Sequence, residues 1–87
     1  MVATDSASGD KYLIDSGAQV SVYPFHSNKW PLSFLLAADG RRIPAWGSLN
    51  LPVAIDGQNF GQFRFVRAAV DRPIVGADFF GNVWSVN

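Results

Sequence analysis

The sequence contains no cysteine and no glutamate, and it has a single histidine, His26. Without cysteine, the chain can form neither disulfides nor thiolate metal sites. One histidine excludes a multi-histidine zinc or iron centre within one chain. No apolar run approaches the roughly 20 residues that a membrane-spanning helix needs. These absences exclude disulfide scaffolds, the common zinc folds and helical membrane proteins.

Charge is scarce and balanced. Seven lysines and arginines offset seven aspartates, so the formal net charge is zero, and charged residues make up 16% of the chain. A neutral domain argues against binding to the phosphate backbone of nucleic acids. A hydrophobic content of 48% is too high for a disordered chain. We therefore expect one small soluble domain, residues 1–87, in an intracellular setting.

Residues that favour β-strands dominate the composition of the chain. Phenylalanine, valine, isoleucine, tyrosine and tryptophan recur in short runs that turn residues interrupt. In residues 49–55 apolar and polar positions alternate, which indicates a strand with one buried face, and Pro52 indicates an edge or a bulge there. Asp39-Gly40 and Asp56-Gly57 are hairpin signals. The expected strands are 2–4, 12–14, 34–38, 41–46, 49–55 and 60–68. One or two helical turns should follow in residues 77–80, with Gly81 and Asn82 ending the helix.

Residues 12–18, Tyr-Leu-Ile-Asp-Ser-Gly-Ala, are the strongest candidate for chemistry. An apolar strand leads directly into Asp15, which places a carboxylate at the buried end of a strand. The Ser16 hydroxyl can bond the neighbouring backbone, and Gly17 allows close approach of another chain or a ligand. The same residues also fit a simple turn, in which Asp15 and Ser16 bond local amides.

Four motifs, in this order and spacing, resemble the retropepsins, the aspartic proteases of retroviruses and gypsy-type LTR retrotransposons. Residues 4–9 with 12–24 are similar to the opening hairpin and catalytic loop, residues 35–47 to the flap, and residues 63–70 and 73–80 to the last core strands and helix. The resemblance covers nearly the whole chain. It implies an all-β fold, a small closed-barrel-like acid-protease monomer with one short C-terminal helix, active as a two-fold dimer.

The resemblance also implies roles for individual residues. Asp15 corresponds to the catalytic aspartate. The residues that would support the active-site loop are Ser16, Gly17 and Ala18, and the Ser16 hydroxyl would bond across the dimer. The flap would contain Ala38, Asp39, Gly40 and Arg41. The residues that would pack beneath the catalytic loop are Ile74, Val75 and Gly76.

The number of carboxylates then implies the assembly. Aspartic protease chemistry needs two carboxyl groups that share one proton, and this chain has one Asp-Ser-Gly. The second Asp15 must come from another copy across a two-fold axis. The resemblance thus implies a homodimeric endopeptidase that cleaves a polypeptide substrate, a Gag-Pol-like polyprotein, in the cytoplasm or a retroelement particle. It implies no metal, no cofactor and no membrane.

Some positions depart from the retroviral pattern, and two other functions stay open. Gln19 and Val20 stand where retroviral members usually have acids, Ala77 stands at the place of a common arginine, and the flap has fewer glycines. One alternative is a catalytically decayed or domesticated protease-fold domain that acts as a dimerisation or peptide-binding module. The other is a small β-barrel that stacks single-stranded nucleic acid on the phenylalanines of residues 60–65, which the neutral charge disfavours.

Overall fold

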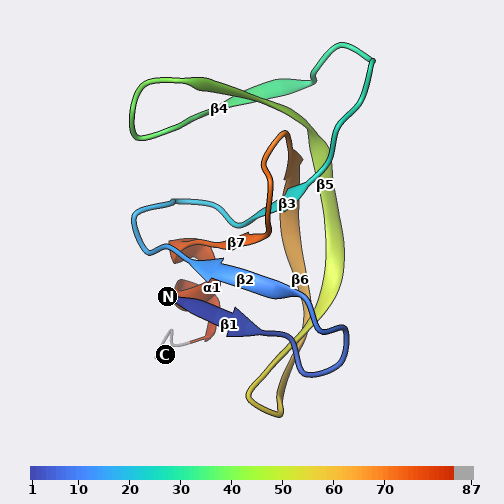
Figure 1. Ribbon diagram of the computed structural model, residues 1–87, viewed down its shortest axis with the longest axis vertical. Helices are drawn as coiled ribbons and strands as arrows, with labels where there is room; N and C mark the ends of the chain where they lie inside the picture. Colours follow the sequence, from blue (N-terminus) through green and yellow to red (C-terminus); the bar gives the residue numbers. More distant parts are fainter. Residues whose placement is uncertain (84–87) are drawn as a thin grey trace.

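Seven strands form one curled sheet in the computed structural model, which describes residues 1–83 (Figure 1). The strands are β1 (Val2–Thr4), β2 (Lys11–Ile14), β3 (Val22–Pro24), β4 (Ser33–Leu36), β5 (Arg42–Ile55), β6 (Gln58–Ala68) and β7 (Ile74–Val75). One helix, α1 (Ala77–Val83), follows them. The spatial order is β1-β2-β7-β3-β6-β5-β4. This architecture confirms the predicted all-β class with one short C-terminal helix.

The sheet curls so strongly that its two halves meet. Asp5, directly after β1, forms an isolated antiparallel bridge with Ile55 at the end of β5. The Ser6 N–H also donates to the Ala54 carbonyl at 2.7 Å. These contacts join the first hairpin to the long β5–β6 hairpin and give the sheet its barrel-like curvature.

The β5–β6 hairpin confirms the Asp56-Gly57 turn, because both residues have the left-handed φ that a tight two-residue turn requires, 54° and 77°. The expected strands 41–46 and 49–55 are, however, one strand. Gly47, with a φ of 84°, lies in a register shift between Ala45 and Ser48. A bulge of this kind bends a strand without ending it.

Pro52 lies where β5 has a single neighbouring strand. It pairs with Gln62 of β6, whereas β4 pairs with β5 only from Arg42 to Ala45. The missing proline N–H therefore breaks no second ladder, which confirms the predicted edge position.

The hydrophobic core gathers on one face of the curled sheet. Its buried members are Tyr12, Val53, Phe65, Val75 and Phe79. Phe63 packs edge-on against Phe79, with ring centroids 4.9 Å apart, and Phe60 packs against the same ring. The phenylalanines of β6 are thus core residues, and they form no exposed platform for nucleic-acid bases.

The helix is longer than the position of Gly81 predicted. α1 extends through Gly81 to Val83, since one glycine in an exposed helical position costs only about 1 kcal/mol relative to alanine. Within residues 1–83, no helix has the length and apolarity required to cross a membrane.

Candidate active site

Asp15 directly follows β2, where the chain turns sharply. Its N–H donates to the Val75 carbonyl of β7 at 3.0 Å, and its own carbonyl accepts from the Ala18 N–H at 3.1 Å. Its carboxylate Oδ1 accepts a 3.0 Å hydrogen bond from the Gly17 N–H. The side chain is exposed in the single chain, so the expected buried acid is not found there. The reason is that β2 ends at Ile14 and the next residue already belongs to the turn.

The alternation of β2 determines which way Asp15 faces. Tyr12 and Ile14 pack in the main core, so Leu13 and Asp15 lie on the opposite face of the strand. Leu13 pairs in parallel register with Ile74. Ile74 in turn packs in a second apolar cluster, whose members include Val22, Ala45, Ala68, Leu35 and Ile43. The Asp15 face of the sheet therefore adjoins an apolar surface.

The three residues after Asp15 form an open turn. Ser16 is exposed, and its hydroxyl forms no hydrogen bond with another residue in the range 1–83. Gly17 lies so close to Asp15 that a Cβ there would be 3.2 Å from Oδ1. The Ala18 carbonyl accepts from the Ala77 N–H at 2.8 Å, which ties the turn to the start of α1.

Residues 74–76 lie directly against this turn. Val75 pairs with Ile14, and Gly76 follows at the closest point of approach. A Cβ on Gly76 would lie 2.7 Å from the carbonyl oxygens of both Ala18 and Val20. These contacts are with backbone atoms that cannot rotate away, so this position accommodates only glycine.

Ser21 and Asp78 form a partly buried link that the sequence did not predict. The Ser21 hydroxyl donates to Asp78 Oδ1 at 2.7 Å, and the Ser21 N–H donates to Oδ2 at 3.1 Å. The same hydroxyl accepts from the Gly76 N–H at 3.0 Å. Ser21 is fully buried. The only local signals are a serine between two valines and an acid in the first turn of the helix.

The β4–β5 hairpin carries the four predicted flap residues, all exposed at its tip, namely Ala38, Asp39, Gly40 and Arg41. Asp39 accepts from the Arg41 N–H at 3.0 Å and from its Nε at 2.7 Å. The backbone hydrogen bond from Arg41, then the side-chain bond, lower the pKa of Asp39. Gly40 supplies the left-handed φ of 88° that the turn needs. In Figure 1 this hairpin and the loop that follows β2 project to the same side of the sheet.

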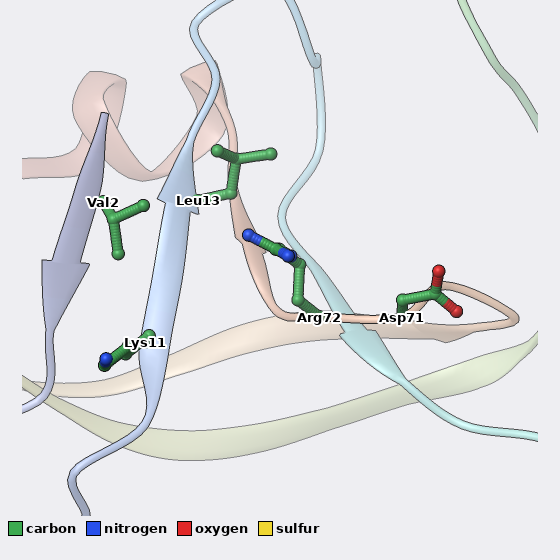
Figure 2. A pocket seen from close by; sticks show the side chains of 5 residues that line it. All are labelled: Val2, Lys11, Leu13, Asp71 and Arg72. Atoms are coloured by element: carbon green, nitrogen blue, oxygen red, sulfur yellow. The ribbon is translucent and has the colours of Figure 1, made fainter.

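Two of the cavities formed by residues 1–83 lie next to each other. The larger, about 480 Å³, is lined by Val2, Lys11, Leu13, Asp71 and Arg72 (Figure 2). The smaller, about 280 Å³, is lined by Arg41, Ile43, Ala69, Val70 and Asp71. Asp71 lines both, so the two cavities are neighbours and extend from the flap hairpin to β2. Within residues 1–83, no three histidine or aspartate side chains come together as metal ligands.

Comparison with known proteins reveals similarity in structure but not in sequence. No protein-family model matches the sequence, and no curated protein matches it. Among solved structures, the EIAV protease complexed with the inhibitor HBY-793 superposes with a TM-score of 0.67 at 16% sequence identity. The match covers all of this chain and 88% of that one. At this identity the likeness concerns the fold alone, and the fold of this chain is that of the retropepsins.

Proposed function

We propose that this chain is an aspartic endopeptidase whose active site forms between two copies, each of which supplies Asp15. The observation that supports this most strongly is that Asp15 directly follows β2 in a chain with a retropepsin fold. Its carboxylate is exposed at the end of β2, on the face that adjoins the apolar cluster. The flap hairpin projects to the same side.

The chemistry follows from two carboxyl groups at short distance. Two like charges a few ångströms apart cannot both ionise easily, so the pair retains one proton. The ionised carboxylate accepts a proton from a water molecule as that water attacks the scissile carbonyl carbon. The protonated carboxyl donates its proton to the carbonyl oxygen, which gives a tetrahedral diol. The carboxyl that took the proton from water then donates it to the amide nitrogen, and the other carboxylate accepts a proton from one diol hydroxyl. The C–N bond breaks, the two products leave as a carboxylic acid and an amine, and the pair again holds one proton. Asp15 and its copy supply both groups, and the reaction consumes only water.

We infer that the second carboxylate comes from another chain, because four of the other six aspartates have hydrogen-bond partners and the remaining two lie outside any Asp-Ser-Gly. Asp5 bonds backbone amides, Asp10 accepts from the Tyr23 hydroxyl at 2.9 Å, and Asp39 and Asp78 have the partners already described. The remaining two, Asp56 and Asp71, follow no Asp-Ser-Gly pattern. A two-fold axis beside the Asp15 turn would pair each carboxylate with its copy. The unbonded Ser16 hydroxyl would then meet the partner loop.

The substrate would be an extended polypeptide between the flap hairpins and the paired Asp15 turns. An extended peptide adds backbone hydrogen bonds in the manner of an extra strand. The apolar cluster of Val22, Leu35, Ile43 and Ile74 would form one wall for its hydrophobic side chains. The natural substrate that the family resemblance suggests is a retroelement polyprotein, cleaved in the cytoplasm or in a particle.

Cleavage of a hydrophobic peptide at mildly acidic pH tests the proposal, with Asp15→Asn as the matched variant. We expect wild-type protein to release fragments and bind a pepstatin-type inhibitor, and Asp15→Asn to do neither while retaining the wild-type circular dichroism spectrum. Equal cleavage by both proteins would contradict the role of Asp15. A dimer that neither cleaves nor binds the inhibitor would favour the non-catalytic peptide-binding module.

A further inference from the structure

We propose that the larger cavity selects an acidic substrate side chain through Lys11 and Arg72. It is called the Lys11–Arg72 pocket below, and Val2, Leu13 and Asp71 complete its lining. The proposal rests on the protease function proposed above and specifies one feature of the substrate. Lys11 and Arg72 are then specificity-determining residues, separate from the Asp15 chemistry.

The pocket shares a strand face with Asp15. Tyr12 and Ile14 point into the core, so Lys11, Leu13 and Asp15 follow one another on the opposite face of β2 and beyond its end. Alternate residues of a strand are about 7 Å apart. Leu13, which lines the pocket, is therefore one such step from Asp15. A peptide held at Asp15 would therefore have the pocket within one such step of its cleaved bond.

The register of β7 brings Arg72 to the same place. Leu13 pairs with Ile74, and the Leu13 N–H donates to the Pro73 carbonyl at 2.9 Å. Arg72, two residues before Ile74, consequently lies beside β2 near Lys11. Figure 2 shows the Arg72 side chain directed towards Leu13, whereas the Asp71 carboxylate points away from it.

The charges in the pocket favour an anion. Two cations and one carboxylate line it, and in residues 1–83 neither Lys11 nor Arg72 forms an ion pair. An ammonium and a guanidinium group offer donors without acceptors, which suits a carboxylate. Val2 and Leu13 add apolar contact for the methylene groups of the same side chain. The depression, about 480 Å³ and half open to solvent, has room for a carboxylate side chain.

Strand geometry also predicts how far the acidic residue of the substrate lies from the cleaved bond. Side chains on one face of an extended peptide recur about every 7 Å, which is the spacing on β2 itself. The pocket begins one step from Asp15. We therefore expect the acidic residue within about two positions of the cleaved bond.

A random peptide library, digested by the purified chain and analysed by mass spectrometry, locates the preference. We expect glutamate or aspartate to be enriched at one position near the cleaved bond. A peptide pair that differs only as glutamate or glutamine at that position should then differ about threefold to tenfold in kcat/KM, the acidic peptide being better. The ratio should fall as salt is added, since ions screen exposed charges beyond about 10 Å at 0.1 M.

Variants assign the preference to the pocket. Arg72→Gln and Lys11→Gln should each reduce the glutamate-to-glutamine ratio of kcat/KM. Arg72→Glu should favour a lysine peptide instead. Arg64→Gln removes an exposed cation of β6 that does not line the pocket, and it should keep the wild-type ratio.

The outcomes separate this proposal from the protease function. Equal cleavage of the glutamate and glutamine peptides by wild-type protein would overturn the acidic preference and leave the protease intact. An unchanged ratio in both the Arg72 and the Lys11 variants would overturn it as well. If wild-type protein cleaves no peptide, or if Asp15→Asn cleaves equally, the protease function fails and this proposal fails with it.

Discussion

The Ser21 hydroxyl donates a 2.7 Å hydrogen bond to Asp78 Oδ1, across 57 residues of sequence. It also accepts a 3.0 Å hydrogen bond from the Gly76 N–H. One buried hydroxyl therefore connects the chain after the Asp15 turn, the end of β7 and the first turn of α1. Gly76 also lies close to the Ala18 carbonyl, so this link adjoins the Asp15 turn.

Ser21→Ala should destabilise the fold by about 1–3 kcal/mol, because it leaves the buried Gly76 N–H without its acceptor. Urea denaturation measures the change in the free energy of unfolding. Ser48→Ala is the matched control, since Ser48 is exposed on β5 and such substitutions stay within about 0.5 kcal/mol. Equal stability of the two variants would show that the link contributes nothing.

Two glycine-to-alanine variants should have opposite effects. Gly76→Ala would place a Cβ 2.7 Å from two backbone oxygens, and overpacking of this kind costs about 1–3 kcal/mol or more. Gly81→Ala adds a methyl group in open space on α1, and it should stabilise the helix by about 0.5–1 kcal/mol. Thermal melts of both variants check this. A Gly76→Ala melt at or above wild type would contradict the close contact.

Local patterns in the sequence predicted much of this fold but few of its long-range hydrogen bonds. The alternation in residues 49–55 and the Asp56-Gly57 turn predicted the β5–β6 hairpin, because both signals are local. The bulge at Gly47 was missed because a glycine can end a strand or bend it, and only the partner strand decides which. The Ser21–Asp78 link was missed because no local rule relates residues so far apart.

At the candidate site, too, the local features were predicted and the long-range contacts were not. A strand that leads into Asp-Ser-Gly was visible in the sequence, and the structure places residues 74–76 against that turn. The exposure of Asp15 was not foreseen, because burial at a strand end depends on neighbouring segments, or on a second copy. The Lys11–Arg72 pocket was not foreseen either, since it depends on the parallel pairing of β2 with β7.

Asp5 should make the fold sensitive to acid. The carboxylate is 2% exposed and accepts hydrogen bonds from the N–H groups of Ala54, Ala7 and Ser8. These bonds, that from Ala54 first, lower the pKa of Asp5 below its ordinary value of 3.8. Because the folded-state pKa is the lower one, the stabilisation is present above pH 3.8 and is lost as the pH falls through the folded-state pKa.

Asp5→Asn should therefore remove part of the acid dependence of the unfolding free energy. It should also cost about 1–3 kcal/mol at neutral pH, since an amide nitrogen replaces an acceptor oxygen among amide donors. Denaturation at a series of pH values measures both effects. Asp56→Asn, in the exposed turn, should stay within about 0.5 kcal/mol of wild type at neutral pH. An Asp5→Asn profile parallel to wild type would contradict the assignment.

Asp39→Ala should impair the flap hairpin without unfolding the protein. It removes the acceptor for the Arg41 backbone and side chain at an exposed tip. We expect a severalfold decrease in kcat/KM with an unchanged melting temperature, because the tip would close less well over the substrate. Asn50→Ala, exposed elsewhere on β5, should retain full activity. Full activity of Asp39→Ala would mean that the hairpin tip does not contact substrate.

The central claim is that two copies of Asp15 form one active site, and a mixing experiment tests it most directly. Wild-type and Asp15→Asn chains are refolded together in equal amounts at constant total concentration, and peptide cleavage is measured. Random pairing leaves about one quarter of the dimers with two Asp15 carboxylates, so the activity should fall to about one quarter of that of wild type alone. An activity of about one half, in proportion to the wild-type chains present, would show that each chain acts alone and would contradict the shared site.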